Sequence, residues 1–270
     1  MKTILVELDS DLGDGRLEVA ADLARAFGSH IVGIQATPVA AYVSFDPFGG
    51  VYALPAVLEA VAEREQEIRR AFEEEMAKED VTWEYRHGNG APADVIAEHS
   101  RLGDLVLMAK PGGEGKRGER LTHVGDVALS SSAPVLAIPP ETRSFDPSGK
   151  ALIAWNGSPE ASRAVRAALP LLRLASEVTL LTAEEPGGKW DLPAMGLAEY
   201  LSRHGIHAII DTLSVTNGDI PYSLLFDVAD RQPAYLVMGA YGRSRAREWL
   251  LGGVTRRMIL DLPAPLLLAH

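Results

Sequence analysis

Residues 151–156 read Ala-Leu-Ile-Ala-Trp-Asn, and residues 4–9 read Ile-Leu-Val-Glu-Leu-Asp, so an apolar run ends in a polar residue twice in one chain. Each run is followed by a segment with helical periodicity, and Gly28 is placed to stop the first of these as a left-handed cap. In the second half, Ser158-Pro159 has the composition of a helix start, a capping residue followed by proline at the first helical position. The chain therefore contains an internal repeat that begins with a strand and a helix.

The repeat continues through both halves. Short helical segments follow Asn89-Gly90 and Asn217-Gly218. Further strands are expected in matching places, at residues 30–34 and 177–181, 104–108 and 234–238, and 134–138 and 265–269. Apolar strands that alternate with helices predict a parallel sheet with helices on both faces. We therefore predict an α/β protein of two doubly wound, Rossmann-like domains, each with a mostly parallel five-stranded sheet.

The domain boundaries follow from the composition between the repeats. We expect a first domain at residues 1–139, a linker at 140–149 and a second domain at 150–270, because the linker is rich in proline and polar residues. The first domain carries extra residues in its middle. Leu58 to Met76 has the spacing of a long amphipathic helix, and Tyr42 to Leu54 before it has the composition of an irregular loop.

The overall composition excludes several classes of protein. The chain has 270 residues, 47% of them hydrophobic and 23% charged, which is ordinary for a globular protein with real cores. It has no cysteine, which excludes disulfides, thiolate catalysis and cysteine-based zinc sites. A formal net charge of −11 argues against a general nucleic-acid binder. No signal peptide and no apolar run long enough to span a membrane are visible, so we expect a cytoplasmic protein without membrane contact.

A glycine pattern in the second half is the sharpest chemical signal. Gly239 and Gly242 stand at the carboxyl end of a predicted strand, where open parallel sheets bind ligands. After nine intervening residues the stretch 252–255, Gly-Gly-Val-Thr, opens a helix, and a helix start with free N–H groups suits phosphate. Five arginines crowd this region: Arg243, Arg245, Arg247, Arg256 and Arg257. The alternative is that the glycines serve only as turns and the arginines as a solvated surface.

On these residues the chain resembles the universal stress protein family, and the resemblance extends over both halves. ATP-binding members carry Gly, two residues, Gly, nine residues, then Gly followed by Ser or Thr. This chain matches at Gly239, Gly242 and Gly252 and has Gly253 at the hydroxyl position, with Thr255 two places on. The family's aspartate after the first strand is Asn156 here.

The resemblance implies a fold like that of the adenine nucleotide alpha hydrolases and a stress-response function. ATP or another adenine nucleotide, with magnesium as a candidate companion, is expected in the second domain. Its binding residues would be Asn156, Gly157, Gly239, Gly242, Arg243, Gly252, Gly253, Val254 and Thr255. The bound nucleotide would regulate contact with a protein partner that the sequence does not identify.

The first domain is expected to have a degenerate site. It keeps Asp9 after its first strand, but the later glycine pattern is missing. Thr122 and His123 stand at the expected helix start, in the places of Gly252 and Gly253, and their side chains should crowd a phosphate.

We expect no enzyme activity and no metal site. The sequence has no Gly-x-Ser-x-Gly elbow and no order of residues that locates a catalytic triad. His204 and His207 flank Gly205, where a helix should end, without a third ligand in place. A slow ATPase or phosphotransfer enzyme that uses Glu248 remains an alternative, as does a scaffold that binds no nucleotide.

The last strand of each half carries a further expectation. Members of the resembled family pair their last strands across a two-fold dimer, so residues 135–138 and 266–269 should pair within this chain as an internal pseudo-dimer. Further oligomerisation is left open.

Overall fold

The computed structural model describes residues 1–9, 13, 15–38, 44–45, 51–52, 55–109, 117–183, 192–242, 253–261 and 264–270. The first half contains these elements: β1 (Thr3–Leu8), α1 (Arg16–Phe27), β2 (His30–Thr37), β3 (Ser44–Phe45), β4 (Val51–Tyr52), α2 (Pro55–Met76), β5 (Thr82–Asn89), α3 (Pro92–His99), the short 3-10 helix η2 (Ser100–Leu102), β6 (Leu105–Ala109), α4 (Arg117–Ser130) and β7 (Val135–Ile138). The second half contains these: β8 (Ala151–Trp155), α5 (Pro159–Leu172), β9 (Val178–Ala183), α6 (Ala194–Arg203), β10 (Ala208–Leu213), α7 (Ile220–Arg231), β11 (Tyr235–Gly239), α8 (Gly253–Asp261) and β12 (Leu266–Ala269).

Ten of these strands form one continuous sheet in the order β10-β9-β8-β11-β12-β7-β6-β1-β2-β5. All neighbours pair in parallel except β12 and β7, which pair antiparallel with Leu267 opposite Leu136. Each half thus contributes five parallel strands, and the strand order of one half mirrors that of the other. The predicted fold class is confirmed, and so is the predicted pairing of the two last strands.

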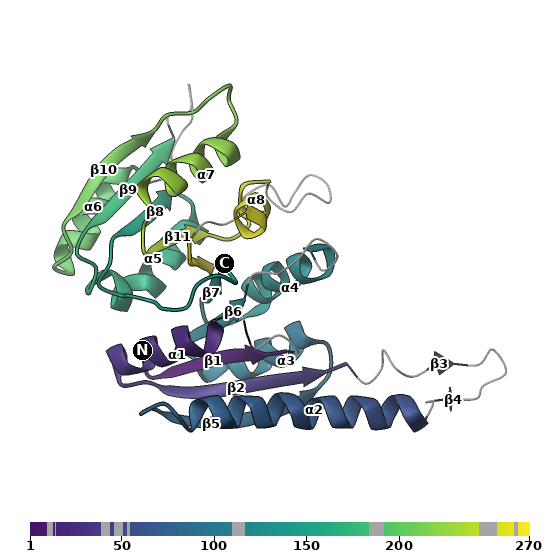
Figure 1. Ribbon diagram of the computed structural model, residues 1–270. Helices are drawn as coiled ribbons and strands as arrows, with labels where there is room; N and C mark the ends of the chain where they lie inside the picture. The colour runs from purple at the N-terminus through teal and green to yellow at the C-terminus, as the bar shows by residue number, and fades with distance from the viewer. Residues whose placement is uncertain are drawn as a thin grey trace.

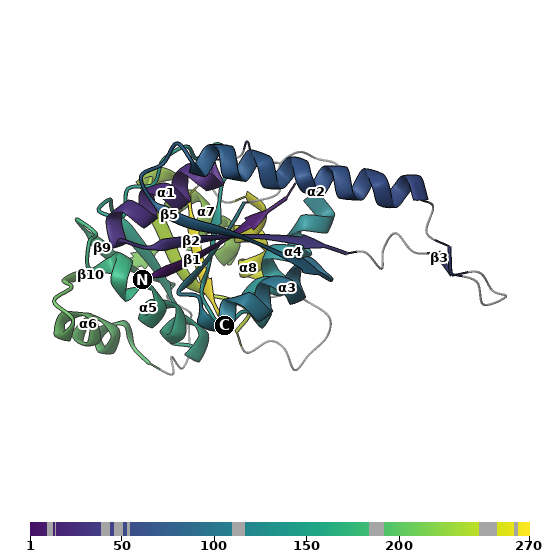
Figure 2. The same ribbon diagram turned by 90° about the horizontal axis from the view of Figure 1, so that it is seen from below.

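Helices cover both faces of this sheet (Figure 1). Helices α1, α2, α5 and α6 pack over one hydrophobic core, and α3, α4, α7 and α8 pack over the other. The junction between the halves is apolar, because Leu136, Leu266 and Leu267 are fully buried there. Burial of each such leucine contributes about 2–3 kcal/mol. Helix α2 runs past the edge of the sheet toward the small β3–β4 hairpin, as both views show (Figures 1 and 2).

Local signals in the sequence explain where several elements end. Gly28 has φ 59° and caps α1 in the left-handed conformation. The Ser158 hydroxyl accepts a hydrogen bond from the Ala161 amide and caps α5, with proline at the first helical position. One boundary was predicted wrongly: α4 begins at Arg117, so Thr122 and His123 lie inside the helix. The region 42–54 was predicted to be an irregular loop, but its described residues include the two-residue strands β3 and β4.

The segment between the halves packs closely against the sheet and its helices. Phe145 is buried, and its ring centroid lies 5.7 Å from that of Tyr235. The Phe145 backbone amide donates a hydrogen bond to Asp22 Oδ2 at 2.8 Å. A Cβ on Gly15 would come within 1.7 Å of the Thr142 carbonyl oxygen, so the start of α1 touches this segment. The expected linker is therefore not wholly a surface feature.

Candidate functional site

The residues predicted to bind a nucleotide meet at one end of the second half-sheet. Strands β8 and β11 pair in parallel, with Ala154 opposite Met238, so Asn156 and Gly239 follow neighbouring strands at their carboxyl ends. The strand order reverses between β8 and β11, because β9 follows β8 on one side and β12 lies beyond β11 on the other. Such a reversal leaves a crevice that binds ligands in open α/β sheets. We call this place the second-half crevice.

The turn after β8 is ordered by its own hydrogen bonds. The exposed Asn156 side chain accepts a hydrogen bond from the Ser158 amide at 3.1 Å through Oδ1. Gly157 has φ 71°, which favours glycine. Asn156 therefore has a structural role in leading the chain into α5, whether or not it also contacts a ligand.

Gly239 is needed because helix α5 packs against it. A Cβ at this position would lie 2.5 Å from the Ala161 amide nitrogen and 2.7 Å from the Glu160 carbonyl carbon, both of which are backbone atoms. From the sequence we predict that the missing Cβ of this glycine leaves room for a ligand. In the structure the first turn of α5 occupies that room, so part of the glycine pattern is explained by packing.

A hydrogen bond of Thr255 connects the turn after β11 to helix α8. Its buried hydroxyl accepts this bond from the Tyr241 backbone amide at 3.3 Å. Tyr241 itself has a positive φ of 53°. Helix α8 begins at the exposed Gly253, and a Cβ there would meet no atom of the described residues within 4 Å. The start of α8 therefore offers N–H groups next to open space, as an anion site requires.

Glu160 places a carboxylate beside this turn. Its Oε2 atom is buried and has no hydrogen-bond partner among the described residues, and a Cβ on Gly242 would lie 3.6 Å from it. A buried carboxylate oxygen without a donor is costly, so it favours a ligand that brings a hydroxyl, an amine or a cation. The same charge opposes a bare polyphosphate.

Tyr241 connects the second-half crevice to the first half. Its side chain is buried, and a Cβ on Gly125 of α4 would come within 2.0 Å of the Tyr241 hydroxyl oxygen. Burial, together with the Asp126 carboxylate, raises the pKa of Tyr241 to about 12 against the opposing charge of Arg256. The turn between Gly239 and Gly242 therefore contacts α4 through the Tyr241 side chain.

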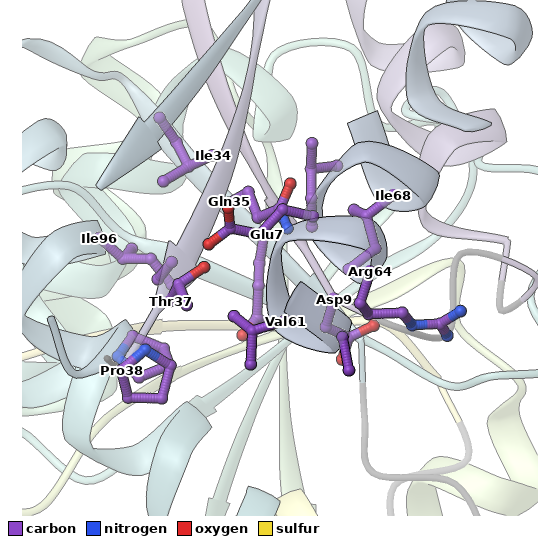
Figure 3. Close-up of a pocket in the computed structure, with 15 residues that line it drawn as sticks. Glu7, Asp9, Ile34, Gln35, Thr37, Pro38, Val61, Arg64, Ile68 and Ile96 are labelled. Atoms are coloured by element: carbon purple, nitrogen blue, oxygen red, sulfur yellow. The ribbon is translucent and has the colours of Figure 1, made fainter. Parts of the chain in front are cut away.

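The first half contains a pocket of about 280 Å³ at the carboxyl ends of β1 and β2, with α2 and α3 beside it (Figure 3). This volume is near the lower end of the range for small-molecule sites. Fifteen residues line it: Glu7, Leu8, Asp9, Ile34, Gln35, Ala36, Thr37, Pro38, Ala60, Val61, Arg64, Glu65, Ile68, Pro92 and Ile96. We call it the first-half pocket.

Charged side chains contact one another beside the end of β1, at one end of this pocket. Arg16 is fully buried; it donates to the Glu7 carbonyl oxygen at 2.8 Å and to Asp9 Oδ1 at 3.1 Å. His123 Nε2 lies 2.5 Å from Glu7 Oε1. Burial lowers the pKa of His123, but the hydrogen bond that His123 donates to Glu7 and the charges of Glu7, Asp126 and Asp9 outweigh it and raise the pKa above its ordinary value. Arg16 and His123 are therefore the two basic side chains that face Glu7.

A second network lies along β2, with partners on β5 and α2. The Thr37 hydroxyl lies 3.0 Å from His87 Nε2, which also lies 3.2 Å from Glu65 Oε1. The Tyr85 hydroxyl donates to Gln35 Oε1 at 2.7 Å. These bonds fix three polar groups that face the pocket, so their positions do not depend on a bound ligand.

The model of the universal stress protein family matches residues 1–139 of this chain. The chain belongs to the universal stress protein family. Among solved structures it is similar to a universal stress protein from Archaeoglobus fulgidus, with 16% identity over 99% of this chain and 97% of that one and a TM-score of 0.74. It is also similar to a functionally unknown protein from Pseudomonas aeruginosa PAO1, with 16% identity over 100% of this chain and 92% of that one and a TM-score of 0.58. At this identity the likeness shows the fold, and no curated protein matches the sequence.

The structure gathers most of the residues predicted for this universal stress protein's nucleotide site. Asn156, Gly157, Gly239 and Gly242 lie together at the second-half crevice, and Gly253, Val254 and Thr255 begin the helix beside it. Arg243 and Gly252 lie outside the described residues, as do Arg245, Arg247 and Glu248. Of the two remaining arginines in the predicted group, Arg256 is exposed and Arg257 is held by Asp261 at 2.6 Å.

Sequence reasoning missed three features of this universal stress protein. Glu160 follows a proline in the first turn of a helix, where an acidic residue has an ordinary stabilising role, so nothing marked it as part of a site. The contact of Tyr241 with Gly125 joins residues from different halves and has no sequence signature. In the first-half pocket only Asp9 had been singled out as a site position. A comparison of polar residues at strand ends would also have found Glu7 and Thr37.

The described part of the chain holds no group of three or more histidine, aspartate or glutamate side chains placed to bind a metal ion. His204 instead ends α6 and lies 3.2 Å from the Arg173 guanidinium, followed by Gly205 at φ 76°. None of the described helices combines the length and the apolarity needed to cross a membrane.

Proposed function

We propose that this universal stress protein binds an adenine nucleotide in the second-half crevice and acts through nucleotide-dependent contact with another protein, without catalysing a reaction. One observation carries the proposal. The turn at Asn156 and Gly157, the turn from Gly239 to Gly242 and the start of α8 converge on one crevice where the strand order reverses. Turns and a helix start that meet at the carboxyl ends of parallel strands are where open α/β sheets bind the nucleoside and the phosphate of a nucleotide.

The chemistry of the crevice favours a nucleotide whose charge is compensated. The N–H groups at Gly253 and Val254 are available to phosphate at a helix start, and the exposed Asn156 is available to the nucleoside. Glu160 disfavours bare negative charge close to Gly242. An adenine nucleotide with few phosphates, or ATP with magnesium on its phosphates, therefore fits better than free ATP.

The contact between Tyr241 and α4 provides a route from the bound nucleotide to the protein surface. A ligand that moves the turn from Gly239 to Gly242 would also move Tyr241, and the close fit of its hydroxyl over Gly125 would transmit this movement to the first half. The surface change would then be read by a partner protein. This step makes the protein a nucleotide-responsive binding protein and gives no residue a catalytic role.

Calorimetric titration with AMP, ADP and ATP, each with and without magnesium, tests the proposal. Gly253→Glu places a negative charge at the start of α8, where a side chain meets open space, and Gly253→Gln is the uncharged control of the same size. We expect the Glu variant to bind nucleotide on the order of tenfold more weakly than the Gln variant, with equal thermal stability. Equal affinity of the two variants, or no binding by the unmodified protein, would contradict the proposed site. Release of phosphate from ATP by the unmodified protein would contradict the absence of catalysis.

A further inference from the structure

The two outer edges of the ten-stranded sheet differ in how they are protected. The sheet ends at β5 on one side and at β10 on the other, and neither strand has an outer neighbour among the strands that the structure describes (Figure 1). On β5, Glu84 pairs with Arg86 at 2.6 Å, and the Arg69 guanidinium of α2 lies over the Tyr85 ring, 5.0 Å from its centroid. Charged side chains of this kind discourage an edge strand from pairing with another chain.

Strand β10 has the opposite character. Its six residues read Ala-Ile-Ile-Asp-Thr-Leu, and Asp211 is the one charged residue among them. Ile209 is 57% exposed and Ile210 is 40% exposed. Because successive side chains of a strand point to opposite faces, each face of the sheet has one of these isoleucines at its edge. An edge strand with exposed apolar side chains and unpaired backbone groups favours the addition of another strand.

The pairing of β10 with β9 shows which face each side chain occupies. Ile210 lies opposite Leu180, which belongs to the core that α5 and α6 cover. Ile209 lies opposite Thr179, on the same face as Leu181, which belongs to the core that α7 covers. The α6 face of this edge therefore carries Ile210, and the α7 face carries Ile209.

These positions make β10 complementary to a second copy of itself. When two copies pair antiparallel with Ile209 opposite its counterpart, Ala208 lies opposite Ile210 and the exposed His207 lies opposite Asp211. Each of the last two pairs occurs twice, once on either side of the two-fold axis. Directly opposed side chains share a face, so apolar groups meet on both faces and an imidazole meets a carboxylate.

Asp211 has room for this second partner. Its carboxylate accepts a hydrogen bond from Arg231 of α7 at 2.7 Å, and its side chain is still 45% exposed. A carboxylate can accept several hydrogen bonds, so Asp211 can bind His207 of a second copy while it holds Arg231.

Other registers of the same pair are less favourable. A shift that puts Ile210 opposite its counterpart would put Asp211 opposite Ile209, a carboxylate against an apolar side chain. A shift by one residue would pair each face of the sheet with the wrong face of the copy. The chain already contains an antiparallel join that keeps the faces matched, because Leu267 of β12 lies opposite Leu136 of β7 and both belong to one core.

We propose that β10 is a homodimer interface, in which two copies of the chain pair their β10 strands antiparallel about Ile209 and join their two sheets into one. The occupant is a second copy because the strand matches itself in both apolar and polar positions in this register. A two-fold interface of this kind closes on itself, and the charged β5 edge opposes further growth, so assembly stops at the dimer. The dimer does not depend on nucleotide binding in the second-half crevice.

Sedimentation equilibrium over a range of protein concentrations tests whether the chain dimerises through this edge. We expect a dimer with a dissociation constant on the order of micromolar. Ile209→Lys places two ammonium groups opposite each other and should weaken the dimer on the order of a hundredfold. Leu102→Lys is the matched control, because Leu102 is 92% exposed and lies in η2 of the first half. Both positions are exposed, so thermal unfolding should show equal stability of the two variants.

Disulfide crosslinking tests the register, because the chain has no cysteine of its own. In the proposed pair the two copies of residue 209 lie directly opposite, with Cα atoms about 4.5–5.5 Å apart, which a disulfide can bridge. The two copies of residue 210 are diagonal neighbours about 7–8 Å apart, which is too far. Ile209→Cys should therefore form a covalent dimer under mild oxidation at least on the order of tenfold faster than Ile210→Cys.

Three results would overturn the proposal. The first is a chain that stays monomeric, which would leave β10 to a strand of another protein or to none. The second is a dimer that Ile209→Lys does not weaken. The third is equal crosslinking of the Ile209→Cys and Ile210→Cys variants, which would show that the strands do not meet in this register.

Discussion

Replacement of Gly239 by alanine tests the structural account of the glycine pattern. The added Cβ would lie 2.5 Å from the Ala161 amide nitrogen, against an ordinary contact distance of 3.4–4 Å. Helix α5 would have to retreat by about 1 Å, because the obstructing atoms belong to its backbone and no rotamer change can relieve the contact. That helix buries six side chains, so its displacement would loosen a large part of the second half's core; they are Ala161, Ala164, Val165, Ala168, Leu171 and Leu172.

The expected cost of Gly239→Ala is about 2–3 kcal/mol of unfolding free energy, the upper part of the range for overpacking. In a chain of this size that lowers the melting temperature by roughly 5–10 °C. Urea unfolding followed by circular dichroism measures the change. Gly253→Ala is the control, because a Cβ there meets nothing within 4 Å in the part of the chain that the structure describes. A Gly239 variant within about 0.5 kcal/mol of the unmodified protein would refute the reasoning, as would an equal loss in the control.

Three further predictions follow from the same contacts. Glu160→Gln removes a charge beside Gly242, so it should strengthen ATP binding on the order of tenfold and leave adenosine affinity unchanged. Equal shifts in the affinities for both ligands, measured by calorimetry, would contradict this. The pKa of His123 is raised in the folded protein, so its stabilising contribution is complete below the ordinary histidine value and is lost as the pH rises through the folded value. The difference in unfolding free energy between the unmodified protein and His123→Gln should therefore fall as the pH rises above the ordinary histidine pKa, and a constant difference would count against the Glu7 contact. Gly125→Ala should lower the unfolding free energy by about 1–3 kcal/mol, because the added Cβ would clash with the Tyr241 hydroxyl. Tyr241→Phe in the same chain removes that hydroxyl and should restore most of the lost free energy. Equal destabilisation of the single and double variants would show that this contact is not the cause.

The fold was predictable from the sequence where strands are buried on both faces. Strands such as β1 and β8 are nearly continuous apolar runs, and that signal identified four strands in each half. The fifth strand of each half, β5 or β10, lies at an outer edge of the sheet. β5 carries half-buried and exposed polar residues, and Ile209 of β10 is 57% exposed, so neither edge strand has the pattern of a buried strand.

The candidate site was predictable in position and less so in the role of its residues. The glycine spacing located the turn after β11, because strand ends and helix starts are encoded locally. The reason for Gly239 is the backbone of α5, almost 80 residues earlier in the chain, and that of Gly125 is a tyrosine in the other half. Contacts between residues so far apart depend on the tertiary fold, and a single sequence does not display them.

The first-half pocket illustrates the same limit. The loss of the glycine pattern predicted a degenerate nucleotide site there, and that remains a prediction. The pocket itself depends on side chains from β1, β2, α2 and α3, which the fold brings together from four separate stretches of the chain. Asp9 and His123 were visible in the sequence, but the bond between His123 and Glu7 was not.

The central claim is that an adenine nucleotide binds in the second half of this universal stress protein. Photolabelling of the full chain with 8-azido-ATP and magnesium, followed by mass spectrometry of the labelled peptides, tests it most directly. Label is expected on peptides from residues 151–270, next to the ends of β8 and β11, and it should be lost when excess ATP is present. Label confined to residues 1–138, or label that excess ATP does not reduce, would contradict it.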